Sequence, residues 1–471
     1  MYFPRAKSPY IITGGIRMRF ARFARLLPAV TLGFLAACSD AETPKVDPCA
    51  DLKVTGTCVG VDLSAADAAD QIAAAFVNAT NNSTIALSAG HLELSSELSF
   101  TGLENIHVRG AGMDQTVLSF AGQSQGAGIH AENVIGITVE DLALEDTAGD
   151  SLFIVESEDI VVRGVRVEWT DGADAGNGKY GIYPVRSTNI LVEHTVSRGA
   201  SDAGIYIGES NNVIARYNNA YENVSGLQIE NCFDSWVYEN TVTNNTLGLF
   251  IFDLPGKLQN KNGGRHLVHD NVVKNNNVKN FADKEAIAGS IPSGTGLLVM
   301  ATANVEVHSN TIEGNNTIGT GVVSFFLAGK PNEDSAYFPY PMTVYIHDNL
   351  IVDNGTNPGQ AGVNDAAIAL NTAFGTDVPE VLFDGLVTTV VDGTPDAALN
   401  PHYICAQANK RAGDEPARFA SLELTLSTNN DIDIDYFLSD AGQAAVLLDP
   451  AAFDCAGPAQ AEVDLGTLGA P

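Results

Sequence analysis

Short apolar runs, separated by glycine, asparagine and other polar residues, recur along the middle of the chain. A glycine followed by an apolar residue returns every 22 or 23 residues, and later after 25. These units are Gly181-Ile182-Tyr183, Gly204-Ile205-Tyr206, Gly226-Leu227-Gln228, Gly248-Leu249-Phe250, Gly296-Leu297-Leu298 and Gly321-Val322-Val323. A second motif, Asn-x-apolar-x-x-Asn, runs in the same phase. Repeats of this length, built from strand-like runs, predict a solenoid.

Each repeat has room for three short strands and three turns, so its strands must pair with the repeats before and after it. The pattern therefore predicts an all-β fold, a parallel β-helix, over residues 61–355 with an insertion at 254–295. An Ala-rich amphipathic helix that ends at Asn78 is expected to cap the first coil, because an open coil is an unpaired sheet edge. Residues 356–471 lose the phase, and we expect C-terminal coils or a cap extension there, with Val381-Leu382-Phe383 as a candidate further strand.

The repeat also aligns the strands into columns with one residue per coil. The residues one after each glycine are apolar, and we expect them to face inward. The outward columns then combine aromatic rings with carboxylates and amides, which predicts a saccharide groove. Its expected binding residues are Tyr183, Arg186, Tyr206, Gln228, Phe250 and Phe252. Its expected acids, bases or calcium ligands are Glu209, Glu230 and Asp253.

Two of these carboxylates suggest a reaction geometry. Glu209 and Asp253 lie two coils apart, roughly 10 Å at the backbone. Such a gap leaves room for a water molecule between two carboxylates, as inverting glycosidases need. The alternative is that outward aromatic and polar ladders only stabilise the sheet surface.

Other repeated polar residues favour structural roles. One asparagine per coil can bond its own backbone and the next coil, and this predicts an amide ladder at Asn218, Asn240, Asn271, Asn310 and Asn349. The histidines at strand or turn positions are also interpreted as ladder residues; they are His107, His130, His194, His269, His308 and His347.

The insertion is rich in basic residues in a chain whose net charge is −32. It contains Lys257, Lys261, Arg265, His266, Lys274, Lys279 and Lys284. Long loops in compact proteins are often functional, so a basic lid that helps to bind a polyanion through Arg265 and His266 is one interpretation. A solvated loop with chance charges is the other.

The repeat pattern over residues 84–354 resembles the right-handed parallel β-helix proteins of the carbohydrate-binding and sugar-hydrolase type, relatives of pectate lyases and mannuronan C5-epimerases. The resemblance to the epimerases is sharpest at Tyr180-Gly181-Ile182-Tyr183-Pro184-Val185-Arg186. That family carries an Asp-Pro-His core at this register. Here Pro184 matches, but Tyr183 and Val185 replace the two catalytic residues, so the epimerase mechanism does not carry over.

The N-terminus has the features of a bacterial lipoprotein signal over residues 1–38. Basic residues and a short apolar run precede Leu35-Ala36-Ala37-Cys38, which matches a lipobox. The resemblance to Gram-negative lipoproteins implies that the non-acidic Ser39 after it favours the outer membrane. Residues 39–60 are then a tether, and Cys38 carries lipid. In an oxidising compartment, two disulfides are expected, Cys49 with Cys58 and Cys405 with Cys455, which leaves Cys232 as a free thiol.

These features predict a lipid-anchored envelope protein, facing the periplasm or the cell surface, that binds an acidic, polyuronate-like polysaccharide; cleavage or modification of that polysaccharide is one interpretation. As an enzyme it would be a lyase, a glycoside hydrolase or an epimerase, with calcium as a candidate cofactor. A non-catalytic carbohydrate-binding module and a docking scaffold for another envelope protein are the alternatives. The strongly acidic composition argues against a nucleic-acid partner, because phosphate contacts need a basic face.

Overall fold

The computed structural model describes residues 47–50, 52, 54, 56–256, 258–360, 364–388, 400–428 and 431–469. The chain divides into Met1–Lys45, which lies outside the described residues together with the predicted signal and Cys38, and Val46–Pro471. Among the described residues, no helix has the length and apolar character needed to cross a membrane.

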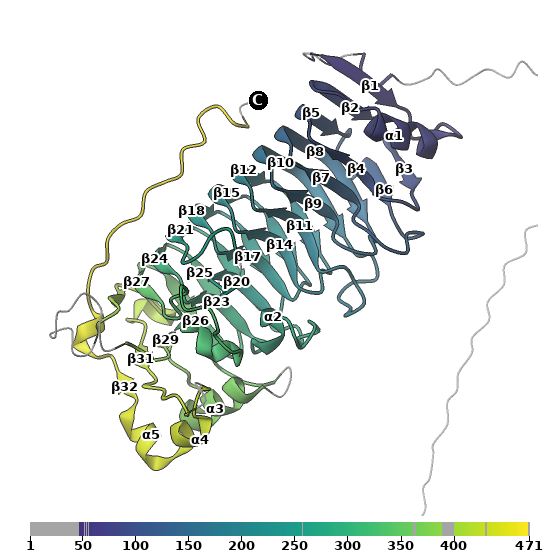
Figure 1. Cartoon of the computed structure of the whole chain (residues 1–471). Helices are drawn as coiled ribbons and strands as arrows, with labels where there is room; N and C mark the ends of the chain where they lie inside the picture. The colour runs from purple at the N-terminus through teal and green to yellow at the C-terminus, as the bar shows by residue number, and fades with distance from the viewer. Residues whose placement is uncertain are drawn as a thin grey trace, which may run out of the picture. The chain divides into compact units, whose positions relative to one another are not determined.

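Val46–Pro471 contains a parallel β-helix whose coils follow one another from the purple α1 end to the yellow α4 and α5 (Figure 1). Its strands form three faces. Face 1 consists of β1 (Thr57–Val61), β2 (Ser83–Leu87), β5 (Glu104–Arg109), the first parts of β8 (Ile135–Glu145) and β10 (Glu158–Glu168), β12 (Thr188–Glu193), β15 (Asn211–Arg216), β18 (Phe233–Tyr238), β21 (Gly264–His269), β24 (Ala303–His308), β27 (Met342–His347) and β30 (Ile404–Gln407).

Face 2 follows face 1 around a corner in each coil, and long β8 and β10 run through that corner. It consists of β3 (Gly90–Glu93), β6 (Thr116–Ser119), the second parts of β8 and β10, β13 (Val196–Arg198), β16 (Asn219–Tyr221), β19 (Thr241–Thr243), β22 (Val272–Lys274), β25 (Thr311–Glu313) and β28 (Leu350–Val352).

Face 3 is a separate sheet and carries the glycine-marked strands of the repeat. It consists of β4 (Leu98–Thr101), β7 (Ile129–Glu132), β9 (Leu152–Val155), β11 (Tyr180–Val185), β14 (Ala203–Gly208), β17 (Ser225–Glu230), β20 (Leu247–Phe252), β23 (Thr295–Met300), β26 (Ile318–Val323), β29 (Val381–Phe383), β31 (Phe419–Ser421) and the antiparallel β32 (Leu447–Leu448).

The core confirms the register that the glycine repeat predicts. Ile182, Ile205, Leu227 and Leu249 pair in one column of face 3 and are completely buried. The free thiol Cys232 is buried in the same apolar core. Burial of branched apolar side chains from all three faces is the main driving force for this fold.

The predicted asparagine ladder is confirmed, and a second one accompanies it. The Nδ2 atom of Asn271 donates to Asn310 Oδ1 and Val237 O, and its own Oδ1 accepts from the Asn240 backbone N at 3.0 Å. The second ladder consists of Asn223, Asn245, Asn276, Asn315 and Asn354. These amides satisfy buried backbone groups at the corners, which would otherwise lack partners.

The N-terminal end is capped as expected. Helix α1 (Ala68–Val77) buries Ile72 and Phe76 against the first coils, and the Phe76 ring lies 5.4 Å from that of Phe100. The Cys49–Cys58 disulfide ties the entering chain to β1, which already begins within the predicted tether.

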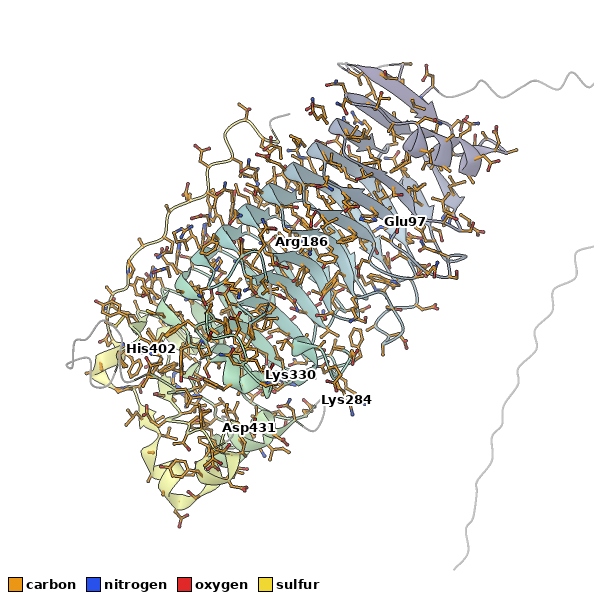
Figure 2. All side chains as sticks on the ribbon, in the orientation of Figure 1. Glu97, Arg186, Lys284, Lys330, His402 and Asp431 are labelled. Atoms are coloured by element: carbon orange, nitrogen blue, oxygen red, sulfur yellow. A yellow bond between two sulfur atoms is a disulfide. The ribbon has the colours of Figure 1, made fainter. Side chains whose placement is uncertain are left out.

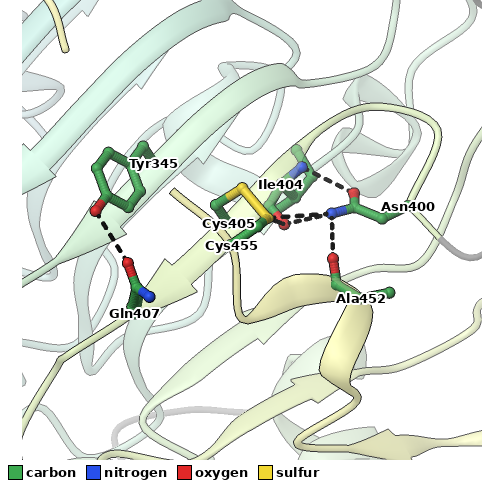
Figure 3. Close-up of a disulfide and its surroundings, with 7 residues drawn as sticks. All are labelled: Tyr345, Asn400, Ile404, Cys405, Gln407, Ala452 and Cys455. Carbon is green, nitrogen blue, oxygen red and sulfur yellow. Dashed lines mark hydrogen bonds between the residues drawn. A yellow bond between two sulfur atoms is a disulfide. The ribbon is translucent and has the colours of Figure 1, made fainter. Parts of the chain in front are cut away.

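The β-helix continues beyond residue 355, where the sequence pattern suggested that it ends. Strands β29, β30 and β31 add parallel pairings to faces 1 and 3. The sequence had suggested a strand at Val381–Phe383, which is β29, but it missed β30 and β31 because long excursions separate them. Helix α3 (Asp365–Phe374) precedes β29, η2 (Ala412–Asp414) lies between β30 and β31, and α4 (Ile434–Leu438), α5 (Asp440–Ala445) and η3 (Ala451–Phe453) follow β31. The predicted Cys405–Cys455 disulfide joins β30 to the segment after η3 (Figure 3).

After this disulfide, residues 456–469 run back along face 1 as an extended strap (Figure 1). Val463 and Leu468 belong to an apolar cluster with Val161, Leu191 and Ile214 on the outside of this face. The Arg163 guanidinium donates to the Gly469 carbonyl. The strap therefore covers an apolar outward column that would otherwise be exposed.

The predicted insertion 254–295 is not one loop. Strands β21 and β22 inside it form a regular coil, paired with β18 and β19 before them and with β24 and β25 after them. Only residues 254–263 and 275–294 leave the repeat, the second with the short helix α2 (Ile287–Ser290). The sequence analysis took this coil for part of a loop because no glycine-apolar unit of face 3 occurs between Gly248 and Gly296.

Candidate functional site

Face 3 carries a stack of rings with one ring per coil. His130 of β7, Phe153 of β9, Tyr183 of β11 and Tyr206 of β14 follow one another with centroid distances of 4.7, 4.8 and 5.0 Å. Tyr180, at the start of β11, lies 4.5 Å from both Tyr183 and Tyr206. The parallel pairing of the strands places these rings in a line along the β-helix axis.

The predicted groove at Tyr206, Gln228, Phe250 and Phe252 is wrong about the exposure of these side chains. These side chains do point away from the β-helix core, but Tyr206 is 6% exposed, Gln228 2% and Phe250 0%. Apolar residues of two excursions pack on Phe250 and Phe252; they include Ile291, Phe325 and Tyr337, with η1 (Phe325–Ala328) among them. The aromatic side chains at this end of face 3 therefore form a second core.

Carboxyl groups gather beside the tyrosines. Asp202 precedes β14, and its Oδ1 accepts from Gln228 Nε2 at 3.3 Å, while the Tyr180 hydroxyl lies 3.5 Å from its Oδ2. Asp150 precedes β9 and accepts from the Tyr180 backbone N at 3.1 Å. Glu230 ends β17, and the Tyr206 hydroxyl hydrogen-bonds to it.

The carboxyl groups of this cluster have unequal proton affinities. Burial raises the pKa of Asp150 and of Asp202 to about 6. Burial, with the nearby charges of Asp202, Glu209 and Asp253, raises the pKa of Glu230 to about 8, although the Tyr206 hydrogen bond opposes this. Burial also raises the pKa of the Tyr180 and Tyr206 phenols well above the usual range, so both stay protonated. With these pKa values Glu230 keeps its proton to a higher pH than Asp202 does, and a general acid and a general base require a difference in this direction.

The other two predicted carboxylates have different surroundings. Glu209 Oε2 accepts from the Gln259 backbone N at 2.7 Å and so holds the excursion 254–263 in place. Asp253 is fully buried beneath Tyr337, whose hydroxyl donates to the Asp253 carbonyl at 2.7 Å. The predicted pairing of Glu209 and Asp253 across a groove is wrong, because the covering segments fill that side of face 3.

The predicted basic lid is also wrong. His266 points into the β-helix core, where burial lowers its pKa to about 3, and Arg265 pairs with Asp234 at 2.6 Å. Lys261 pairs with Asp334 and Lys274 with Glu313. Lys261, Arg265 and Lys274 are thus paired, and Arg265 and His266 belong to a regular coil. Lys257 of the predicted lid lies outside the described residues. Arg186, labelled in Figure 2, lies at the turn after β11 and pairs with Glu156 at 3.1 Å.

Asp150, Tyr180 and Asp202 did not emerge from the sequence as candidate residues. They occupy the turn just before the glycine-marked strands or the first position of β11, whereas the column analysis began at the glycine. Extending the same alignment backward by two residues would have placed Asp202 beside Lys179, one coil apart.

The histidine ladder on face 1 is confirmed for three members. The rings of His269, His308 and His347 stack at 4.9 and 5.1 Å on successive coils. In the described part of the chain, no group of three or more His, Cys, Asp or Glu side chains is arranged to hold a metal ion.

Comparisons with known proteins agree with the β-helix. Residues 127–277 match a family model described as a right-handed β-helix region. A search of curated proteins found no match. Among solved structures, the mannuronan C-5 epimerase AlgE4 A-module of Azotobacter vinelandii is 20% identical, covering 78% of this chain and 88% of that one, with a TM-score of 0.47.

Two further solved structures are similar. The exopolygalacturonase of Thermotoga maritima is 12% identical, with 64% of this chain and 87% of that chain covered and a TM-score of 0.43. The GH87 α-1,3-glucanase of Streptomyces thermodiastaticus is 15% identical, with coverages of 76% and 64% and a TM-score of 0.40. At these identities the similarity is one of fold.

Proposed function

We propose that the protein binds a polysaccharide along face 3 and performs acid–base chemistry on it with Asp202 and Glu230. The observation that carries this proposal is the joint presence of an aromatic stack and two carboxyl groups with separated pKa values of about 6 and about 8. Flat rings pack on the apolar faces of sugars, and a matched acid and base suit cleavage or modification of a glycan.

The charge of the glycan is a separate question. A polyuronate was predicted from the basic segment 254–295, but Lys261, Arg265 and Lys274 are paired with carboxylates and His266 is buried. Lys179 is the cation that acts on both Asp150 and Asp202 and lowers their pKa values. We therefore propose a polyuronate as one substrate class, to be compared directly with neutral glycans. A non-catalytic binding module or docking scaffold is the second candidate, and the near-complete burial of Tyr206 and Gln228 favours it over an enzyme with an open groove.

Removing the exposed part of the ring stack tests binding. Replacing Phe153 and Tyr183 with alanine together should weaken glycan binding by about tenfold or more, because each aromatic contact contributes on the order of 1 kcal/mol. The measurement is isothermal titration with a panel of polyuronates and neutral glucans. Tyr217→Ala is the matched control, since Tyr217 is exposed and stacks on His194 at 4.9 Å away from face 3. Equal affinity of the wild type and the double variant would remove face 3 as the binding surface.

We also propose that the protein is an envelope lipoprotein anchored through Cys38. The motif Leu35-Ala36-Ala37-Cys38 after a short apolar run supports this proposal. Such an anchor would place face 3 where envelope or extracellular polysaccharides are found.

Cys38→Ser should abolish acylation and move the protein from the membrane fraction to the soluble envelope fraction, because the serine cannot form the thioether to lipid. Mass spectrometry of the mature N-terminal peptide measures the acyl chains directly. Ser39→Ala serves as the control and should leave them in place. A wild-type peptide without acyl chains would refute the anchor.

A further inference from the structure

The C-terminal end of the β-helix is only partly covered by the turn η3. Phe453 of this turn joins the main core, and its ring lies 4.7 Å from that of Phe419. A cavity of about 540 Å³ lies beside them and is lined by the apolar Ala406, Pro416 and Phe419. A cavity of this size is within the range of sites that hold small ligands.

The lining of this cavity includes the last member of the asparagine ladder. In the preceding coil, the Asn349 backbone N and Nδ2 both donate to Asn409 Oδ1, at 3.1 and 2.8 Å. Asn310 makes the same pair of hydrogen bonds to Asn349. Asn409 lines the cavity, is 6% exposed, and donates through Nδ2 to Ile346 O at 2.8 Å, but no further asparagine of the ladder follows it in the described part of the chain. The ladder therefore aims the Asn409 backbone N–H and one Nδ2 hydrogen into the cavity, where an amide oxygen would continue it.

The charged groups around the cavity favour a neutral ligand over an anion. Lys410 and Arg418 line it, but Lys410 pairs with Asp414 at 3.2 Å and Arg418 with Glu380 at 2.9 Å. Asp414 and Asp449 line it as well. An anion would meet these carboxylates without an unpaired lysine or arginine among the described lining residues. Hydroxyl groups of a neutral ligand can donate to the same carboxylates.

An extended peptide does not fit this end as an added strand, because the outer edge of β30 is already occupied. Asn400 Oδ1 accepts from the Ile404 backbone N at 2.8 Å, and Asn400 Nδ2 donates to Ile404 O at 2.7 Å (Figure 3). The Cys405–Cys455 disulfide lies beside these contacts (Figure 3). A strand added here would have to displace Asn400.

From these observations we propose that the cavity binds an N-acetylated hexosamine. The acetamido oxygen takes the position of the next ladder oxygen and accepts from Asn409, while the acetamido methyl group lies against Ala406 and Phe419. The sugar hydroxyls donate to Asp414 and Asp449. This is a second saccharide site, and its recognition chemistry does not depend on the carboxyl groups of face 3.

The test compares N,N′-diacetylchitobiose with cellobiose, which carries hydroxyls in place of the acetamido groups. NMR titration of the full protein should show about tenfold or more tighter binding of the acetylated disaccharide, because cellobiose leaves the Asn409 donors unpaired. Asn409→Asp keeps the acceptor for Asn349 but loses the Nδ2 donor, and Ala406→Leu fills the space of the methyl group. Each variant should lower the affinity for the acetylated disaccharide about tenfold.

Asn354→Asp is the matched control. Asn354 is the last member of the second ladder and accepts from the Asn315 backbone N at 3.0 Å, but it is not among the described residues that line the cavity. This variant should bind the acetylated disaccharide as the wild type does. Melting temperatures show whether Asn409→Asp remains folded, and Ala406→Leu decides if it does not.

Absence of binding of N,N′-diacetylchitobiose, or equal binding of the two disaccharides by the wild type, would overturn the proposal. Unchanged affinity in Ala406→Leu and in folded Asn409→Asp would do the same. Binding of N-acetylalanyl-lysine amide in place of the sugar, lost in Asn409→Asp, would assign the cavity to a peptide and also overturn it. Replacing Phe153 and Tyr183 should leave binding of the acetylated disaccharide at wild-type strength, so this site and face 3 are tested separately.

Discussion

The wild-type protein should lose stability as the pH rises from about 4 to about 8, and Asp253→Asn should abolish a large part of that loss. The Asp253 side chain is fully buried, and neither of its carboxyl oxygens has a well-formed hydrogen bond within the described part of the chain. Burial raises the pKa of Asp253 to about 8, although the Gly263 and Asn231 amides and the Thr302 hydroxyl moderate the rise.

The direction of this effect follows from proton binding. In the unfolded chain Asp253 loses its proton near pH 4, whereas in the folded protein it keeps the proton up to about pH 8. Between these values the folded state binds more protons, so the free energy of unfolding falls by up to about 1.4 kcal/mol per pH unit for this group. Over the whole interval the loss amounts to several kcal/mol, and above pH 8 it is complete.

Urea unfolding of the wild type and Asp253→Asn at a series of pH values measures this loss. The free energy of unfolding of the variant, relative to that of the wild type, should be higher at about pH 8 than at about pH 5. Asp234→Asn alters a surface carboxylate paired with Arg265 and serves as the control. A residual slope is expected from Glu230, whose pKa is also raised by burial. Parallel pH profiles of the wild type and Asp253→Asn would show that Asp253 titrates normally.

The sequence predicted the coil architecture because one physical requirement repeats in every coil. Ile205 and Leu227 must fill the same position in the core, and Asn240 and Asn271 must satisfy the same corner backbone groups. Such constraints leave a periodic signal. The direction of Tyr206 and Phe250 away from the core also followed from strand alternation.

The segments that cover outward side chains leave no periodic signal in the sequence. Phe250 and Phe252 occupy the same columns as Tyr206 and Gly208, but residues about 40 to 90 positions later in the chain, including Ile291 and Tyr337, pack on them. These contacts arise in excursions whose path the repeat does not specify. For the same reason His266 was interpreted as a loop residue, although the pairing of β21 places it in the core.

The candidate site likewise combines residues that the repeat predicted with residues that it did not. Tyr183 and Glu230 lie in the predicted columns, and the structure brings them to the same face. Asp150 and Asp202 reach that face from turns, where spacing varies from coil to coil. Their raised pKa values depend on burial by side chains from neighbouring coils, which no single repeat encodes.

Glu230→Gln and Asp202→Asn should each lower turnover of the best-bound glycan by about 10² to 10⁴-fold, the usual contribution of a positioned acid or base. Asp202 acts as a base only when ionised, so activity should rise as the pH passes about 6. Glu230 acts as an acid only when protonated, so activity should fall as the pH passes about 8. The wild type should therefore show a bell-shaped pH profile of activity with its maximum between these values. Because the two carboxyl groups interact, the two apparent pKa values of this profile describe the pair and not the single residues.

Glu209→Gln provides the matched control for this experiment. Glutamine can still accept the hydrogen bond from the Gln259 backbone N, so this variant should keep that contact and most of the turnover. Glycan affinity of Glu230→Gln should stay within a few-fold of the wild type, because the ring stack is unchanged. Glu230→Gln should also lose the alkaline limb of the pH profile, an effect that a merely structural role of Glu230 would not produce. If Glu230→Gln and Asp202→Asn instead retain the wild-type rate and profile, the cluster has no acid–base role, and face 3 is a binding surface without chemistry of its own.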